Sequence, residues 1–270
     1  MHSSFSLENK VIIVTGATGV LGHSFVNGLA EAGAIVGVLG RNEAVANERA
    51  EEIIKKGGKA IALIADVQDE GQLLAARDLV LKTYGRIDGL VNGAGGNRPD
   101  GILQPDENIF KLNVDGMKEV MDLNLWGTLL PTQVFGESLT ENGGSIVNIS
   151  SMSAQRALSK VMGYSLAKAA VDAYTRWFSV ELANRYQDKV RMNAIAPGFF
   201  LTDQNRALLT TEDGGFTQRG QLVLNQTPFK RFGHPDELIG ALIWLLSDAS
   251  KFVTGTVVNV DGGFIVNSGV

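Results

Sequence analysis

The chain has 270 residues, of which 44% are hydrophobic and 20% are charged, and its formal net charge is −5. A chain of this size buries a sizeable core, and a net negative charge argues against binding to nucleic acid or to an anionic membrane surface. The absence of cysteine excludes disulfides, thiolate nucleophiles and cysteine-bound metal, and it fits a reducing compartment. We therefore expect a cytoplasmic protein that acts on a small molecule.

No segment of the sequence indicates a membrane anchor or a metal site. Residues 1–9 are polar, and no apolar run approaches the length of about 18 residues that a membrane span requires. The histidines His2, His23 and His234 lack the spacing of metal ligands, so we predict no metal and no zinc-dependent chemistry. Because no repeat, low-complexity segment or linker divides the chain, residues 1–270 are predicted to form a single domain.

Apolar, β-branched runs alternate along the chain with stretches that favour helices. We predict strands at residues 10–15, 34–39, 59–65, 87–91, 145–150, 190–196 and 256–260. We predict helices at residues 23–32, 43–56, 69–84, 116–141, 164–186 and 235–246. Such alternation gives right-handed crossovers and a parallel α/β sheet. The irregular stretch at about 199–231 is longer than most loops and is predicted to be a substrate-binding lid.

A glycine-rich turn follows the first strand. Glycines between a strand and a helix let the backbone approach a pyrophosphate, and they present N–H groups at the positive end of the helix dipole. The turn is therefore predicted to bind a dinucleotide. The residues concerned are Gly16, Thr18, Gly19, Val20 and Leu21.

Arg41 follows the second strand, 25 residues after Gly16, near the position of a side chain that reads the cofactor ribose. The strand ends at Gly40, so it offers no carboxylate to a free 2′-hydroxyl, whereas a guanidinium suits a 2′-phosphate. Arg41 therefore favours NADP over NAD. Glu43 lies nearby, however, and a solvated loop arginine is an equally good interpretation.

The third and fourth strands also end in residues that suit a cofactor. Asp66, followed by Val67, can accept a hydrogen bond from an adenine amino group, or it can simply cap the next helix. Asn92 can bind backbone and hold the loop after the fourth strand, where Ala94 and Gly95 leave room for a cofactor. A plain turn is the alternative at this position.

The predicted helix at 116–141 contains two residues that need an explanation. Asn124 lies between two leucines, where a polar side chain is costly unless its hydrogen bonds are satisfied. Pro131 is expected to kink the helix because it lacks a backbone N–H.

Tyr164 and Lys168 lie four residues apart in an alanine-rich run, so they share one helical face. An ammonium one turn away favours the phenolate and lowers the tyrosine pKa from about 10. Ser151 closes the fifth strand, where its hydroxyl can bond the substrate oxygen that Tyr164 protonates. The three residues predict acid/base chemistry on an alcohol or carbonyl. A packed tyrosine beside a surface lysine is the alternative interpretation.

The positions of these residues reinforce one another. Gly16, Asp66, Asn92, Ser151 and Pro197 each follow the end of a predicted strand. In a parallel sheet the carboxyl ends of the strands meet at one edge, and ligands bind there. One fold therefore gathers these residues along one edge.

These motifs together resemble the short-chain dehydrogenase/reductase family over nearly the whole chain. The residues that carry the resemblance are Thr15 to Gly22, Asp66, Asn92, Gly93, Ala94, Gly95, Asn124, Ser151, Tyr164, Lys168, Pro197 and Gly198. The resemblance implies a Rossmann-type, doubly wound, seven-stranded sheet, NAD or NADP as cofactor, and a homotetramer. Two residues depart from the usual pattern, because Val20 replaces the middle glycine of the first loop and Gly93 replaces an asparagine or alanine.

The resemblance also implies a role for each residue of the site. Tyr164 acts as the acid/base, and Lys168 lowers its pKa and binds the nicotinamide ribose. Ser151 orients the substrate oxygen, and Asn124 anchors a water of the proton relay. The cofactor-binding set extends to Pro197 and Gly198.

Residues 95–100 and 196–206 are similar to the branch of D-mannonate oxidoreductases, also called fructuronate reductases. A sugar acid needs a cation for its carboxylate and polar groups for its hydroxyls. The candidates are Asn97, Arg98, Arg156, Lys160, Gln204, Asn205 and Arg206. For any one arginine, a solvated surface position is the alternative. Activity of the gluconate 5-dehydrogenase or 3-oxoacyl reductase type, and a nucleotide sensor without turnover, are the competing functions.

Overall fold

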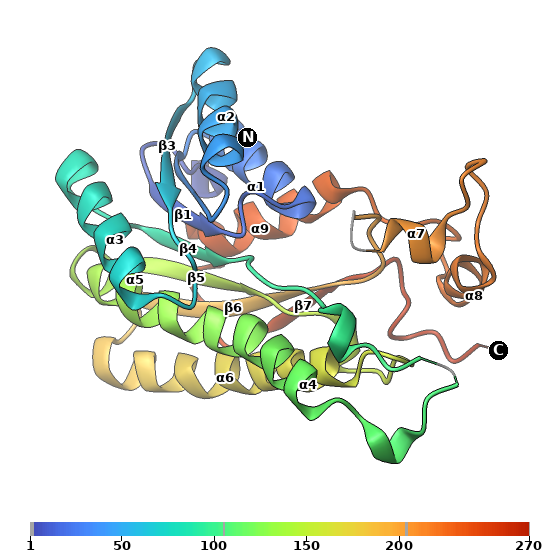
Figure 1. Ribbon diagram of the computed structural model, residues 1–270. Coiled ribbons are helices and arrows are strands. Elements are labelled where there is room, and N and C mark those ends of the chain that lie inside the picture. Colours follow the sequence, from blue (N-terminus) through green and yellow to red (C-terminus); the bar gives the residue numbers. More distant parts are fainter. Residues whose placement is uncertain (1–2, 105, 203–204, 270) are drawn as a thin grey trace.

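The computed structural model describes residues 3–104, 106–202 and 205–269. Its centre is a seven-stranded sheet in the order β3-β2-β1-β4-β5-β6-β7, in which every pair of neighbouring strands is parallel. The strands are β1 Val11–Thr15, β2 Ile35–Gly40, β3 Lys59–Ile64, β4 Gly89–Asn92, β5 Gly144–Ile149, β6 Val190–Pro197 and β7 Val257–Val260. The predicted doubly wound, seven-stranded parallel sheet is thus confirmed (Figure 1).

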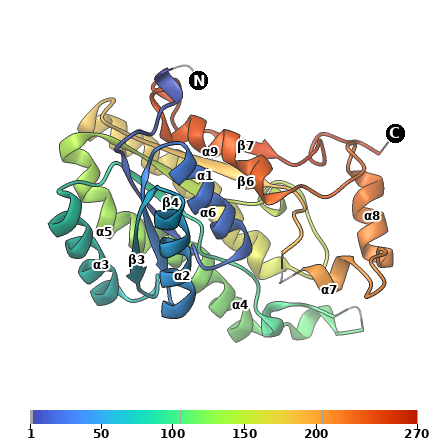
Figure 2. The same cartoon turned by 90° about the horizontal axis from the view of Figure 1, so that it is seen from above.

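Helices cover both faces of this sheet (Figures 1 and 2). The α-helices are α1 Val20–Glu31, α2 Glu43–Lys55, α3 Glu70–Tyr84, α4 Val114–Met121, α5 Gly127–Asn142, α6 Met162–Tyr186, α7 Arg206–Leu209, α8 Gln218–Gln226 and α9 Ile239–Leu246. Helices α1, α2 and α9 pack on one face around Phe25 and Leu245. Helices α3, α5 and α6 pack on the other face around Phe135 and Met192. Because both faces are covered, strands β1 and β2 are buried along their whole length.

The predicted helix at 116–141 is divided in two. Helix α4 ends at Met121, a π-helical turn occupies Asp122–Trp126, and α5 begins at Gly127. In this turn the Gly127 N–H donates to the carbonyl of Asp122, five residues back. The interruption thus precedes Pro131, which lies inside α5. A π-turn often marks a functional site, and this one faces the carboxyl edge of the sheet through Leu123.

The predicted irregular stretch at 199–231 contains two helices, so that part of the prediction is wrong. Helix α7 is a single turn, and α8 is capped by Thr217, whose hydroxyl accepts a hydrogen bond of 3.0 Å from the Gly220 N–H. Both helices lie beyond the carboxyl ends of the strands (Figure 1). None of the helices within the described ranges combines the length and apolar character that a membrane crossing demands.

Candidate active site

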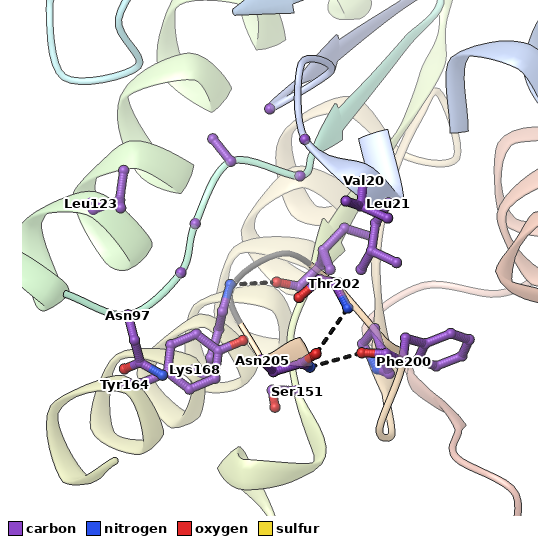
Figure 3. A pocket seen from close by; sticks show the side chains of 18 of the residues that line it. Val20, Leu21, Asn97, Leu123, Ser151, Tyr164, Lys168, Phe200, Thr202 and Asn205 are labelled. Atoms are coloured by element: carbon purple, nitrogen blue, oxygen red, sulfur yellow. Dashed lines mark hydrogen bonds between the residues drawn. The ribbon is translucent and has the colours of Figure 1, made fainter. Parts of the chain in front are cut away.

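A cavity of about 700 Å³ opens at the carboxyl edge of the sheet. Most of the residues predicted from the sequence line it. They are Gly16, Thr18, Gly19, Val20, Leu21, Arg41, Asp66, Val67, Ala94, Gly95, Asn97, Arg98, Ser151, Lys160, Tyr164, Lys168, Pro197, Gly198 and Asn205. Figure 3 shows Val20 and Leu21 toward one end of this cavity, and Tyr164, Lys168 and Asn97 toward the other.

Tyr164 and Lys168 lie one turn apart near the start of α6. The Lys168 Nζ lies 5.5 Å from the centroid of the Tyr164 ring and donates a 2.8 Å hydrogen bond to the Ile149 carbonyl at the end of β5. Lys168 is only 3% exposed, and burial lowers its pKa to about 8. Burial also raises the pKa of Tyr164, while a hydrogen bond with Ser151 opposes that rise. Burial therefore outweighs the expected lowering of the tyrosine pKa, and Tyr164 is protonated at neutral pH, as a general acid must be.

Ser151 is held in a fixed orientation next to Tyr164. Its Oγ accepts hydrogen bonds from the N–H of Ser153, at 3.1 Å, and from the hydroxyl of Ser153, at 3.0 Å. Because its acceptor sites are used by Ser153, its own proton is left for Tyr164 or for a substrate oxygen. This geometry fits the predicted role in orienting the substrate.

Asn124 is not among the described residues that line the cavity, and its implied place in the proton relay stays a prediction. Its amide donates to the carbonyls of Gly96 and Val120, each at 2.7 Å, and accepts from the Gly96 N–H at 2.9 Å. The side chain is fully buried, and its donors and its acceptor are all engaged. In this structure Asn124 therefore holds the loop after β4 against the π-turn.

Asn92 is also absent from the cavity wall, and its side chain does not hold the following loop as predicted. Its Nδ2 donates to the Thr132 hydroxyl and the Asn148 side chain, each at 2.9 Å, inside the core. The loop is held instead by Thr15, whose hydroxyl accepts the N–H groups of Gly93 and Ala94 at 3.1 and 3.2 Å. The Asn92 side chain thus couples β4 to α5 and β5.

The glycine turn leaves the N-terminus of α1 open to a ligand. Gly16 has a φ of +67°, and a Cβ there would lie 2.7 Å from the Ala94 N, so only glycine fits. Gly19 is the N-cap residue, with no side-chain cap and no acidic residue in the first turn of α1. Free N–H groups at a helix N-terminus suit the pyrophosphate of a dinucleotide. Arg49 of α2 donates to the carbonyls of Ala17 and Gly19, which braces this turn although Val20 replaces the usual glycine.

Arg41 and Asp66 lie together in the wall of the cavity. We call this part, which includes the glycine turn, the cofactor end. Arg41 Nη1 lies 3.3 Å from Asp66 Oδ2, and Asp66 Oδ1 accepts the Gln68 N–H at 3.0 Å. Helix α3 is capped by Asp69, so the alternative interpretation of Asp66 as its cap is wrong. At Gly40 a Cβ would lie 2.6 Å from the Thr18 side chain, so a larger residue at this strand end would have to displace Thr18.

Two arginines predicted to bind substrate lie elsewhere. Arg156 Nη1 donates to the carbonyls of Phe264 and Asn267, at 2.8 and 3.0 Å, and so anchors the C-terminal segment. Arg206 is exposed on α7 and does not line the cavity, while Gln204 falls outside the described residues. The prediction that both arginines bind substrate rests only on their closeness in sequence to other site residues. Packing between distant parts of the chain places them away from the cavity.

The structure brings one unpredicted cation into the cavity. Arg219 of α8 lines the wall, and its Nη1 donates to the Ser159 hydroxyl at 3.2 Å. The only feature of the sequence that could have indicated a role for Arg219 in the site is its position inside the predicted lid. Asn97 has a buried Oδ1 with no hydrogen-bond partner among the described residues.

Comparisons with known proteins define the class. A family model described as enoyl-(acyl carrier protein) reductase matches residues 16–265. An uncharacterized oxidoreductase from Bacillus subtilis (strain 168) is 41% identical over 275 residues, with 98% of each chain covered. The chain belongs to this family of short-chain dehydrogenase/reductases and is an NAD(P)-dependent oxidoreductase that acts on alcohol and ketone groups.

Two solved structures are similar to this chain over almost its full length. A candidate D-mannonate oxidoreductase from Haemophilus influenzae, with bound NAD, has a TM-score of 0.90 and 42% identity, and the match covers 98% of each chain. A gluconate 5-dehydrogenase from Burkholderia cenocepacia J2315, in complex with NADP and tartrate, has a TM-score of 0.85 and 33% identity, with 97% and 98% covered. These relatives support use of NAD(P) by this chain, and the open N-terminus of α1 fits such a group.

Proposed function

We propose that this chain catalyses reversible hydride transfer between NAD(P)(H) and the ketone or secondary alcohol of a sugar acid, with D-fructuronate and D-mannonate as the favoured pair. The observation that carries the proposal is the charge of the cavity wall. Arg98, Lys160 and Arg219 line the cavity that contains Tyr164, and Asp66, at the cofactor end, is the only carboxylate among the described lining residues. A cationic wall favours a substrate that carries a carboxylate.

Polar groups near these cations support a hydroxylated substrate. The buried Asn97 Oδ1, unpaired among the described residues, can accept a hydrogen bond from a substrate hydroxyl. Lys160 has a φ of +75°, and backbone in this conformation is costly for a side-chain-bearing residue. Its carbonyl accepts the Leu103 N–H at 2.9 Å, which joins the loop after β4 to the loop before α6. The names of the relatives, a candidate D-mannonate oxidoreductase and a gluconate 5-dehydrogenase, point to the same class of substrate.

The residues of this chain supply the proton. When bound, the nicotinamide cofactor supplies or accepts the hydride. Tyr164 gives its hydroxyl proton to the substrate oxygen during reduction, and Ser151 donates a hydrogen bond to the same oxygen. The buried Lys168 ammonium stabilises the resulting phenolate, since an opposite charge nearby favours the ionised form.

The residues at the end of the cavity near Arg41, where we expect the cofactor ribose to bind, favour NADP. Arg41 can turn from Asp66 to a 2′-phosphate, and no carboxylate is present at Gly40 for a free 2′-hydroxyl. The pairing of Arg41 with Asp66 leaves NAD as the alternative, because Asp66 competes for the guanidinium. The relative strength of these two contacts sets the preference.

The test is a substrate panel followed at 340 nm with NADPH and with NADH. D-Fructuronate, 5-keto-D-gluconate and a 3-oxoacyl thioester distinguish the favoured pair from activity of the gluconate 5-dehydrogenase or 3-oxoacyl reductase type. We expect the wild type to oxidise NADPH or NADH rapidly when D-fructuronate is the substrate. The Tyr164→Phe variant should show no oxidation of either cofactor. Turnover restricted to the thioester contradicts the sugar-acid proposal. Cofactor binding with no turnover of any ketone points to a nucleotide sensor.

The role of the cationic wall is tested by a matched pair of variants. Arg219→Met removes a lining cation, and we expect the KM of the sugar acid to rise about 10-fold or more, because charged hydrogen bonds contribute about 1.5–3 kcal/mol. Arg206→Met removes an exposed cation outside the cavity and should leave KM within about 2-fold. Equal effects of the two changes would indicate a long-range field and not a carboxylate contact at Arg219.

A homotetramer in the cytoplasm remains a prediction. Helix α6 exposes Trp177 at 64% and Val180 at 57%, and the π-turn exposes Trp126 at 56%. Large apolar side chains grouped on exposed helices are typical of subunit interfaces. Light scattering that gives a monomer mass at micromolar concentration would contradict the predicted assembly.

A further inference from the structure

Helix α6 carries a row of ionisable side chains that extends beyond the tyrosine and lysine already described. Tyr164, Lys168, Asp172 and Arg176 are each four residues apart, so they lie on one face of the helix. Lys168 and Asp172 are each 3% exposed, whereas the Arg176 side chain is 58% exposed. The row therefore runs from the cavity, through two buried charged groups, to the surface.

Asp172 is held in the core by few partners. The Ser150 hydroxyl donates to its Oδ1, and Arg176 Nη2 lies 3.8 Å from its Oδ2. Ser150 lines the cavity directly before Ser151, so this carboxylate is attached to the strand end that carries the substrate-orienting serine. A buried carboxylate is costly, and burial raises the pKa of Asp172. Its one ion pair, with the partly exposed Arg176, is long, so this pair does not account for a carboxylate buried at Asp172.

The surroundings of Lys168 provide an explanation. Three elements surround the Lys168 ammonium. Its own helix places Tyr164 and Asp172 near it, and β5 places the neutral Ile149 carbonyl there. The π-turn places the neutral Asn124 amide there, next to Gly95. Among the described residues, Asp172 is the only anion that opposes the effect of burial on the pKa of Lys168. Without an anion nearby, a fully buried ammonium tends to lose its proton.

We propose that Asp172 is a positioning residue that keeps the Lys168 ammonium protonated inside the active site, with Ser150 holding the carboxylate in place. The inference rests on the proposed role of Lys168 in stabilising the Tyr164 phenolate. Loss of the Asp172 charge leaves Lys168 neutral in the pH range of catalysis. Tyr164 then gives up its proton without a cation nearby.

The test replaces Asp172 by asparagine, which keeps its size and its hydrogen bond with Ser150 but removes the charge. The titration of Lys168 is followed by NMR of protein with ¹³C-labelled lysine, assigned with Lys168→Met. We expect the midpoint to fall by about one to two pH units, as removal of a unit charge about one helical turn away predicts. Since no substrate is needed, this measurement stands even if the proposed sugar-acid activity is wrong.

Turnover provides the second readout with any ketone that the wild type reduces. At pH 8 we expect Asp172→Asn to lose about 10-fold or more of the wild-type rate, and near pH 6 to come within about 3-fold of it. Asp172→Glu, which keeps the charge, should restore most of the rate at pH 8. An unchanged Lys168 midpoint, or the same fractional loss at every pH, overturns the proposal.

The control is Thr175→Val on the same helix. Thr175 is fully buried and accepts a 2.9 Å hydrogen bond from Asn148, so its loss perturbs the packing near Asp172 without removing a charge. We expect lower thermal stability and an unchanged Lys168 midpoint. If Asp172→Asn does not fold, Asp172→Ser, which leaves room for water beside Ser150, is measured in its place with the same expected shift. A midpoint in that variant equal to that of the wild type likewise overturns the proposal.

Discussion

The ammonium of Lys168 donates to the carbonyl of Ile149 at 2.8 Å, and this contact joins helix α6 to the carboxyl end of strand β5. It fixes the lysine between the Tyr164 ring and the loop at Gly95. The same contact uses one of the three ammonium protons and leaves the others for ligands. The acid/base site is therefore assembled from a helix start, a strand end and a loop.

Tyr164→Phe is expected to abolish turnover and to spare cofactor binding. The ring still packs over Lys168, but the transferable proton is gone, so the rate should fall about 10³-fold or more. NADPH fluorescence should give a dissociation constant within about 3-fold of the wild type. Tyr186→Phe, at the far end of the same helix, is the control and should keep full activity. Substantial activity in Tyr164→Phe would place the acid elsewhere.

Lys168→Met is expected to raise stability at neutral pH while it removes activity. Burial lowers the pKa of Lys168 from 10.5 to about 8, so the folded state disfavours the charged form. The cost is at most about 3 kcal/mol, and leaving the Ile149 carbonyl unpaired offsets about 1 kcal/mol. The net gain at pH 7 is thus about 2 kcal/mol.

The pH dependence of that gain has a definite sign. Between pH 8 and 10.5 the unfolded wild type binds a proton at Lys168 that the folded protein has lost, so wild-type stability rises with pH. The advantage of Lys168→Met should therefore shrink across this window in denaturant titrations. Lys118→Met, at an exposed lysine, should show no such trend. A constant difference from pH 7 to 10.5 would mean that the Lys168 pKa is not lowered.

Gly95→Ala is expected to damage the site, because an added Cβ would lie 2.6 Å from Asn124 Oδ1 and 3.1 Å from Lys168 Nζ. The crowding should cost about 1–3 kcal/mol of stability and weaken cofactor binding. Gly240→Ala in α9 is the matched control, because a Cβ there meets no described atom within 4 Å. This control should be neutral or stabilising by up to about 1 kcal/mol. Calorimetry and NADPH titration of both variants measure the difference.

Arg41→Ala and Asp66→Asn are expected to change the cofactor preference in opposite directions. Without the guanidinium, the KM for NADPH should rise about 10-fold or more, because a charged contact to the 2′-phosphate is lost. Without the carboxylate that pairs with it at 3.3 Å, Arg41 is free for NADPH, whose KM should fall relative to that for NADH. The ratio of kcat/KM for the two cofactors measures both effects. An unchanged ratio in Arg41→Ala would remove Arg41 from the ribose site.

The sequence alone predicted the parallel sheet and the pairing of Tyr164 with Lys168. The alternation of strands and helices is a local pattern, and residues four apart on a helix meet wherever that helix is packed. The strand ends could also be placed, because parallel strands bring Gly16 and Ser151 to the same edge. These features depend on neighbours in the chain or on one general rule of topology.

Only the tertiary structure decided which polar side chains face the cavity. Arg156 lies near the site in sequence but bonds carbonyls at Phe264 and Asn267, more than 100 residues away, whereas Arg219 enters from α8. The side chains of Asn92 and Asn124 donate hydrogen bonds to Thr132 and to the Gly96 carbonyl, partners that the sequence did not reveal, and their roles at the cofactor and in the proton relay stay predictions. Asp172 carried no motif at all. Hydrogen bonds between residues far apart in the chain depend on how the elements pack, and no local pattern specifies that packing.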